Sequence, residues 1–172
     1  MQILVISDTH ITNPGKLPTP LIEKARTVDC IIHAGDFTGV QVYEFLMTLG
    51  HLEAVRGNSD EPALRGCLPM KRVVEIDNVR IGVIHGHGAP FGMARRALSE
   101  FQGVSPQADV QAVVFGHAHK PIQETIGNVL TINPGSPTSN RFQTSNTYGM
   151  LTISDGVVTG EICELPATNV SR

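Results

Sequence analysis

The sequence predicts an α/β protein whose core is two packed β-sheets with helices on the outer faces. In the first third of the chain, strand-like and helix-like segments alternate, which is typical of a parallel sheet with crossover helices. In the remainder, short runs rich in Val, Ile, Leu and Thr are joined by pairs of turn-forming residues, which favours β-hairpins. Strands in this number bury their apolar faces best when they form two sheets that pack against each other. We therefore expect a layered sandwich.

The first part of the chain has the order strand, helix, strand, helix, strand. Pro20 stands in the first turn of the first helix, where a missing N–H costs little, and Gly50 ends the second helix. The five predicted segments are, in order, residues 2–7, 19–27, 29–33, 40–49 and 51–56.

The second part is richer in strands and turns. Asp77-Asn78 joins two β-branched runs into a predicted hairpin, and further hairpin turns are expected at Gly127-Asn128 and Asp155-Gly156. One helix, which ends before Gly103, interrupts this series. The predicted segments are strands at residues 71–76 and 79–84, a helix at residues 93–101 and a strand at residues 110–115.

Length and composition limit the kind of protein. A chain of 172 residues with 41% hydrophobic residues fits one domain, residues 1–172, with a sizeable core. The net charge of −3 gives no sequence-wide basic field, so we expect small substrates rather than general nucleic-acid binding or anionic membranes. We find no basic signal-peptide region and no apolar stretch long enough to cross a membrane. The three cysteines, without CxxC spacing, are interpreted as reduced thiols of a cytoplasmic protein.

Five short polar signatures lie along the chain, and each follows a run of apolar residues, one of which ends in Arg56. In α/β sheets the loops beyond the carboxyl ends of the strands converge and form the ligand site, so these distant side chains are expected to meet. The signatures are Asp8-Thr9-His10, Gly35-Asp36, Gly57-Asn58-Ser59-Asp60, His85-Gly86-His87 and Gly116-His117-Ala118-His119.

The signatures combine donors that suit first-row transition metals. Carboxylates, an amide oxygen and imidazoles suit Mn, Fe, Co, Ni or Zn, whereas oxygen ligands alone would suit Mg or Ca. Asp8 and His10 are spaced to reach one ion from a turn, and His117 and His119 would serve one ion or two adjacent ions. A two-metal site needs a bridging group, and Asp36 is the natural candidate because a carboxylate has two oxygens.

Each of these residues also has an ordinary structural interpretation. Asp8 and Asp36 taken singly would be turn or helix-capping carboxylates, and Asn58 after a glycine would occupy a left-handed turn. His85 or His117 taken singly would be a hydrogen-bonded core histidine. The full set, with four candidate histidines distributed over three signatures, favours metal ligation.

The succession DxH, GD, GNxD, HGH and GHxH resembles the calcineurin-like metallophosphoesterases, and more narrowly their small bacterial and archaeal phosphodiesterase branch. The resemblance runs from Asp8 to about Ser136 and includes Asn133-Pro134-Gly135-Ser136. It implies the four-layer fold of that family, with two divalent ions at one edge of the sheets; Mn²⁺ is the expected ion, with Fe, Zn, Ni or Co as alternatives. The implied ligands are Asp8, His10, Asp36 and His119 for one ion, and Asp36, Asn58, His85 and His117 for the other.

The activity that this resemblance implies is hydrolysis of a small phosphodiester. Two ions about 3.5–4 Å apart lower the pKa of a bridging water, hold a phosphate oxygen and stabilise charge in an in-line displacement. Asn58 supplies a neutral oxygen, which keeps the site less negative for an anionic substrate, so it also counts as a catalytic and substrate-binding residue. The four histidine ligands must be neutral to coordinate, so activity is expected to fall in mild acid.

One position departs from the family pattern. In many relatives the signature around Asn58 reads GNHD or GNHE, with a histidine thought to protonate the leaving group, whereas this chain has Ser59. Serine is a poor general acid, so diesters with easily released alcohols should be favoured and monoesters should be poorer substrates. His87, two residues beyond His85, is the candidate catalytic residue that would take over this role and contact the phosphate or leaving group. Arg141 is the candidate for phosphate binding.

Two other functions stay open from the sequence. One is a non-catalytic scaffold, as in the eukaryotic retromer subunit of the same fold, although that relative departs from the metal pattern at key ligand positions. The other is a nucleotide or phosphoprotein phosphatase, although the short chain has little surface with which to recognise a protein substrate. Assembly as a homo-oligomer is also left open.

Overall fold

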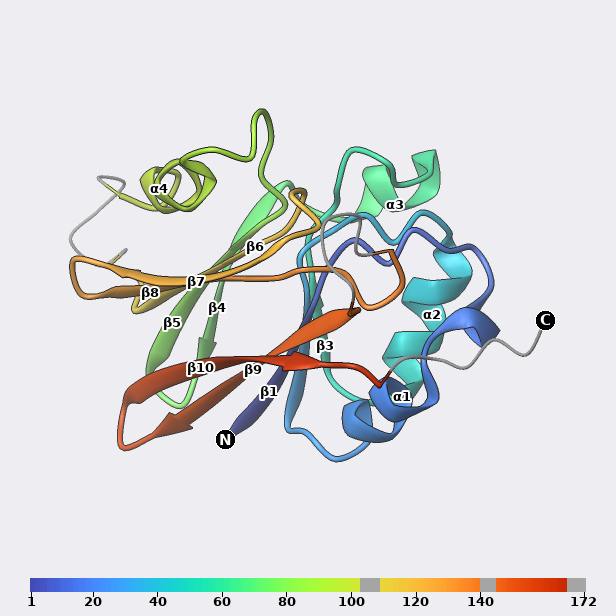
Figure 1. Cartoon of the computed structure of the whole chain (residues 1–172), viewed down its shortest axis with the longest axis horizontal. Helices are drawn as coiled ribbons and strands as arrows, with labels where there is room; N and C mark the ends of the chain where they lie inside the picture. Colours follow the sequence, from blue (N-terminus) through green and yellow to red (C-terminus); the bar gives the residue numbers. More distant parts are fainter. Residues whose placement is uncertain (103–108, 140–144, 167–172) are drawn as a thin grey trace.

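The chain folds into four layers, helix, sheet, sheet and helix (Figure 1). The computed structural model describes residues 1–102, 109–139 and 145–166. Its α-helices are α1 (Thr19–Ala25), α2 (Val40–Leu49), α3 (Pro62–Cys67) and α4 (Met93–Ser99). The first three cover the outer face of one sheet and α4 covers the other, so the predicted sandwich with outer helices is confirmed. No helix in the described ranges is both long and apolar enough to span a bilayer.

The first sheet has the strand order β10-β9-β1-β2-β3. Its strands are β1 (Gln2–Ile6), β2 (Cys30–His33), β3 (Leu52–Ala54), β9 (Thr147–Ser154) and β10 (Val157–Glu164). β1, β2 and β3 run parallel, and the hairpin of β9 and β10 joins them antiparallel to β1. The crossovers between the parallel strands contain α1 and α2, as the alternation of the sequence predicted.

The second sheet has the strand order β4-β5-β6-β8-β7. Its strands are β4 (Lys71–Ile76), β5 (Val79–Ile84), β6 (Ala112–Phe115), β7 (Pro121–Ile126) and β8 (Val129–Pro134). β5, β6 and β8 run parallel, while β4 and β7 are the antiparallel partners of two hairpins. The predicted turns at Asp77-Asn78, Gly127-Asn128 and Asp155-Gly156 therefore connect paired strands.

Alternation along β1 separates the two sides of the core. Ile3 and Val5 belong to the cluster between the two sheets, whereas Leu4 and Ile6 pack with residues of α1 and α2. All four side chains are fully buried. A strand buried on both faces has the continuous apolar sequence that the first strand shows.

The predicted helices and strands are present: α2, β4 and β5 have the predicted bounds, and the others are shorter by one or two residues at one or both ends. Two short helices were not predicted. These are η1 (Pro14–Lys16), a 3₁₀-helix, and α3. Both are too short to show a helical repeat of apolar residues, and α3 also contains Gly66. The third predicted helix, α4, ends at Ser99 rather than at Phe101, and Gly103, where it was expected to stop, lies outside the described residues.

The three cysteines are unpaired. Cys30 lies within β2 and is buried, and burial raises the pKa of its thiol to about 12. It therefore stays protonated and serves as a small core residue rather than a nucleophile.

The topology gathers the polar signatures at one edge of the sandwich. Asp8 follows β1 and Asp36 follows β2 in the first sheet, whereas His85 follows β5 and His117 follows β6 in the second. Within each sheet these two strands are parallel neighbours, so their carboxyl ends point the same way. The candidate site is consequently built where the two sheets meet, with donors from both.

Candidate metal centre

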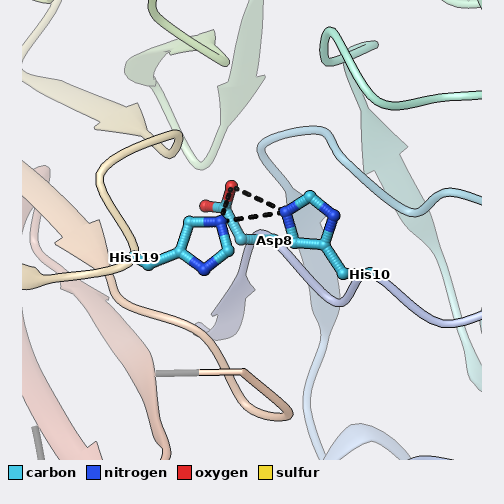
Figure 2. A group of neighbouring side chains, drawn as sticks. All are labelled: Asp8, His10 and His119. Carbon is cyan, nitrogen blue, oxygen red and sulfur yellow. Dashed lines mark hydrogen bonds and ion pairs between the residues drawn. The ribbon is translucent and has the colours of Figure 1, made fainter. Parts of the chain in front are cut away.

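Three donor atoms meet at one point between the sheets (Figure 2). Nε2 of His10 lies 2.9 Å from Nε2 of His119, and Oδ1 of Asp8 lies 3.8 Å and 3.4 Å from these two nitrogens. Asp8 and His10 follow β1, whereas His119 follows β6 of the other sheet. Two imidazole nitrogens that face a carboxylate oxygen at these distances can hold a metal ion.

A second group of donors lies beside the first. Oδ1 of Asn58 lies 3.2 Å from Nε2 of His85 and 3.0 Å from Nδ1 of His117. Asp36 lies between the groups, because its Oδ2 is 3.4 Å from Nε2 of His10 and 3.4 Å from Nε2 of His85. The structure thus brings together every residue of the two ligand sets that the family resemblance implied.

Asp36 and His85 determine each other's charge. Burial opposes ionisation of Asp36, but the hydrogen bond and charge of His85 outweigh it and hold the pKa of Asp36 well below its usual value. Burial likewise disfavours the protonated ring of His85, but the hydrogen bond to Asp36 and the charge of Asp8 raise its pKa above the usual value. The two carboxylates therefore stabilise positive charge at this point, whether it is a proton or a metal ion.

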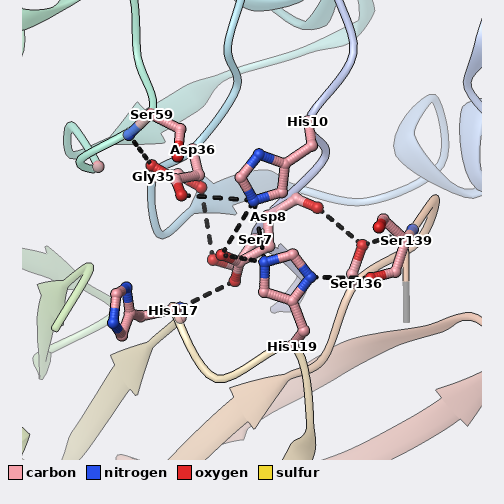
Figure 3. A network of polar contacts seen from close by, with 12 residues as sticks. Ser7, Asp8, His10, Gly35, Asp36, Ser59, His117, His119, Ser136 and Ser139 are labelled. Carbon is pink, nitrogen blue, oxygen red and sulfur yellow. Dashed lines mark hydrogen bonds and ion pairs between the residues drawn. The ribbon is translucent and has the colours of Figure 1, made fainter. Parts of the chain in front are cut away.

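Backbone carbonyls hold the outer nitrogens of two histidine rings. Nδ1 of His85 donates to the carbonyl of Ala34 at 2.7 Å. Nδ1 of His119 donates to the carbonyl of Ser139 at 2.8 Å, and Figure 3 shows this contact. With the proton on Nδ1, each ring presents the lone pair of Nε2 to the centre. Contacts of this kind orient metal-binding histidines and select their tautomer.

Asp8 shows that the donors fit a cation. Its side chain is fully buried, and Oδ2 accepts the backbone N–H of His117 at 2.9 Å. Oδ1 accepts no hydrogen bond from any residue in the described part of the chain. A buried carboxylate oxygen without a donor is costly unless a cation neutralises it. The mixed nitrogen and oxygen donors around this atom fit a divalent transition-metal ion.

The backbone of the centre has a conformation that residues other than glycine rarely adopt. Five candidate ligands have φ between 45° and 69°: Asp8, His10, Asp36, His117 and His119. The other non-glycine residues with positive φ in the described ranges are Thr38 and three residues of hairpin turns. Strained backbone of this kind persists where the surrounding structure holds it and is concentrated at functional sites.

Gly57 lets the loop after β3 lie against Asp36. A Cβ at this position would collide with the carboxylate and backbone nitrogen of Asp36. The close approach allows the N–H of Ser59 to donate to Oδ1 of Asp36 at 2.7 Å. Asp60 holds the same turn, because its carboxylate accepts the N–H of Gly57 at 2.7 Å and that of Thr38 at 2.9 Å.

Two residues support the centre although no role there was predicted for either of them, and His33 was expected only as a hydrogen-bonded core residue. His33 is fully buried against the ring of Phe37, and its Nδ1 accepts the N–H of Gly35 at 3.2 Å. Burial holds the pKa of His33 well below its usual value, so the ring is neutral and can accept this bond. The hydroxyl of Ser136 donates to the carbonyl of Asp8 at 2.7 Å (Figure 3). The signal for His33 was its place in an apolar strand just before Gly35.

The residues predicted to contact substrate lie in different places. Asn58 lies within the donor cluster. His87 is exposed and lines a cavity together with Asn58 and His85. Glu100 lies in the same wall, and the hydrogen bond and charge of Lys71 lower the pKa of its carboxyl. Arg141 falls outside the described residues, so its predicted role stays a prediction.

Fold and site together define a metal-binding α/β protein with its centre between two sheets, and comparison with known proteins identifies the family. Residues 1–156 match the family model of the calcineurin-like phosphoesterase superfamily domain. A probable metallophosphoesterase of Methanothermobacter thermautotrophicus is 37% identical over 143 residues, which cover 82% of this chain and 80% of that protein. A phosphodiesterase of Methanocaldococcus jannaschii is 30% identical over 147 residues, which cover 78% and 83%. The chain belongs to the calcineurin-like phosphoesterase superfamily.

Solved structures share the fold over almost the whole chain. Vps29 of Entamoeba histolytica, solved in complex with zinc, superposes with a TM-score of 0.72 at 27% identity. The match covers 95% of this chain and 99% of that one. The four-layer arrangement is therefore that of known members of the fold.

Proposed function

We propose that this protein is a metal-dependent phosphodiesterase that hydrolyses small phosphodiesters. Membership of the phosphoesterase superfamily and the named phosphodiesterase relative support this activity. The observation that carries the proposal is the position of Asp36, whose Oδ2 lies 3.4 Å from Nε2 of both His10 and His85. A carboxylate placed between two groups of donors is suited to bridge two ions.

The proposed centre holds two divalent ions, with Mn²⁺ as the expected metal. Asp8, His10, Asp36 and His119 would hold the first ion, and Asp36, Asn58, His85 and His117 would hold the second. Two such ions would activate water and stabilise the charge that develops on the phosphoryl group. The zinc complex of the similar Vps29 structure and the unsatisfied Oδ1 of Asp8 support a metal at this site.

The chain's own residues orient the substrate. Asn58 contributes a neutral oxygen, so the centre carries less negative charge toward an anionic diester. His87 lines the adjacent cavity and contacts the phosphate or the departing alcohol, and Arg141 is the further proposed phosphate contact. The proposed partner is a small phosphodiester, and the three unpaired cysteines suit the reducing environment of the cytoplasm.

A non-catalytic scaffold is the second candidate function, because Vps29, a vacuolar sorting protein by name, shares this fold. The two functions make different demands on Asp36. A scaffold needs its surface but not a bridging carboxylate, whereas a two-metal hydrolase needs Asp36 for both ions.

The test combines metal analysis with hydrolysis of a matched pair of aryl esters. Wild type, Asp36→Ala and the control Asp109→Ala are assayed with added Mn²⁺ on a bis-aryl phosphodiester and an aryl phosphomonoester. Asp109 is exposed just before β6, at the opposite end of that strand from His117. We expect two ions per chain and faster turnover of the diester in wild type and in Asp109→Ala. Asp36→Ala should lose metal and fall to background turnover.

Three outcomes would contradict the proposal. Absence of turnover of both esters by metal-loaded wild type would favour the scaffold. Equal turnover by wild type and Asp36→Ala would separate the activity from this centre. A clear preference for the monoester would favour a phosphatase.

A further inference from the structure

A cavity of about 470 Å³ lies beside the candidate metal centre, and Asn58 and His85 of the centre form part of its wall. A space of this size is large enough for a small organic ligand. The rest of the wall comes from the loop after β3, α3, the start of β4 and the segments flanking α4. Its chemistry-bearing side chains are Arg56, Arg65, Met70, Lys71, His87 and Glu100.

The wall carries unbalanced positive charge. Lys71 and Glu100 neutralise each other through an ion pair at 2.9 Å. Arg56 and Arg65 have no carboxylate within ion-pair distance among the described residues. Nη1 of Arg56 donates to the carbonyl of Arg65 at 2.8 Å, which holds this guanidinium beside α3 and leaves its other N–H groups available. Two guanidinium groups in one cavity wall suit the oxygens of a phosphate group.

The same wall has an apolar part. Met70 is 67% exposed, although a methionine is usually buried, and Ile84 lies deeper in the cavity wall. A methionine side chain adapts its shape to flat or irregular ligands and makes favourable contacts with aromatic rings. The cavity therefore combines a surface for a ring with a site for an anion.

We infer that this cavity binds one half of the diester substrate, and that this half is a nucleotide with its own terminal phosphate. The inference rests on the proposed function, which locates the scissile phosphate at the metal centre. Arg56 and Arg65 bind the terminal phosphate, while Met70 and Ile84 pack against the base. The substrate class is thus a short linear oligonucleotide that carries a terminal phosphate.

Binding of a product-like nucleotide tests the inference without any turnover. Adenosine 5′-monophosphate and adenosine are titrated calorimetrically into the full-length, metal-free protein. Without metal, Asp8 and Asp36 repel a phosphate at the centre, so a phosphate-dependent gain must come from elsewhere. We expect the dissociation constant of the monophosphate to be at least about tenfold lower than that of adenosine, because charge-assisted hydrogen bonds strengthen binding by this amount.

Arg65→Gln is the decisive variant. Arg65 is exposed, and the substitution retains the backbone carbonyl that accepts the hydrogen bond from Arg56. It should abolish most of the advantage of the monophosphate over adenosine. Arg95→Gln, which removes an exposed arginine of α4 outside the cavity wall, should behave like wild type. Met70→Glu, which adds a negative charge to the wall, should weaken the monophosphate more than adenosine. Equal affinities for the two ligands, or an Arg65→Gln variant identical to wild type, would overturn the inference.

Turnover separates this inference from the proposed function. Metal-loaded protein is assayed on diadenylate with and without a 5′-terminal phosphate, and the ratio of the two kcat/KM values is compared between wild type and Arg65→Gln. We expect a ratio of about ten or more in wild type that collapses in the variant. Retained hydrolysis of the aryl diester with a ratio of one in wild type would refute the nucleotide inference and leave the proposed function standing. Loss of all hydrolysis would refute the proposed function instead.

Discussion

Ser59 is exposed at the edge of the candidate metal centre, where its backbone and its side chain make different contacts. Its N–H donates to Asp36, and its hydroxyl accepts the side-chain amide of Asn58 at 3.1 Å. The backbone contact is independent of the side chain, so another residue at this position would still hold Asp36. The side chain can therefore be exchanged to test how the leaving group is protonated.

Ser59→His should accelerate hydrolysis of esters with poor leaving groups. An imidazole beside Asn58 can donate a proton to a departing alkoxide, and general acids of this kind contribute about 10²-fold or more. The measured quantity is the turnover rate of an alkyl aryl diester divided by that of an alkyl phosphomonoester, at equal metal content. This ratio should fall in Ser59→His. Ser59→Ala is the control and should keep the wild-type ratio. An unchanged ratio in Ser59→His would show that leaving-group protonation is not what limits monoester hydrolysis.

At the scale of the elements, the segment that follows α4 packs against a glycine of β5. A Cβ on Gly82 of β5 would lie 2.8 Å from the ring of Phe101, which follows α4 and is buried. The segment between β5 and α4 contains His87, and Glu100 after α4 lines the cavity beside the centre. The packing of Phe101 on β5 therefore helps to set the position of Glu100 in one wall of that cavity.

Gly82→Ala should destabilise the protein by about 1–3 kcal/mol, because an extra methyl group in a filled core displaces its neighbours. The measurement is the free energy of unfolding from denaturant titration. Gly66→Ala is the matched control, since a Cβ on Gly66 of α3 meets nothing within 4 Å and alanine favours a helix. It should be neutral or slightly stabilising. A Gly82→Ala variant as stable as Gly66→Ala would show that Phe101 moves aside without cost.

At the scale of the whole molecule, metal binding should stabilise the fold, because the proposed ligands come from loops of both sheets. Mn²⁺ at about 100 times its dissociation constant should add about 2.7 kcal/mol to the free energy of unfolding. The stabilisation should vanish at pH 5, where imidazoles are protonated and no longer coordinate. Thermal unfolding with and without Mn²⁺ at pH 7.5 and pH 5, together with metal analysis, measures both effects.

Asp36→Ala should show little of this stabilisation at either pH, whereas Asp109→Ala should match wild type. An equal shift in the melting temperature of Asp36→Ala would mean that Mn²⁺ binds elsewhere. Full stabilisation that persists at pH 5 would contradict ligation by the histidines.

Much of the fold followed from local features of the chain. The apolar strand sequences, the helix ending at Gly50 and the turn at Asp77-Asn78 are each explained by a few neighbouring residues, and the structure contains all three. α3 escaped prediction because a helix of six residues shows no periodic pattern. The order β10-β9-β1 was not predicted, since pairing between distant strands depends on long-range packing.

By itself the sequence determined the order of the longer helices and strands and the set of candidate donor side chains, because apolar periodicity and donor chemistry are properties of neighbouring residues. The tertiary structure decided that Asp36 lies between two histidine groups, that Oδ1 of Asp8 is buried without a hydrogen-bond donor among the described residues, and that His33 supports the loop at Gly35. It also decided that Arg56 and Arg65 share one cavity wall. Each of these contacts depends on distances between the loops of the two sheets and the helices on them. Those distances are set by how the sheets and helices pack together.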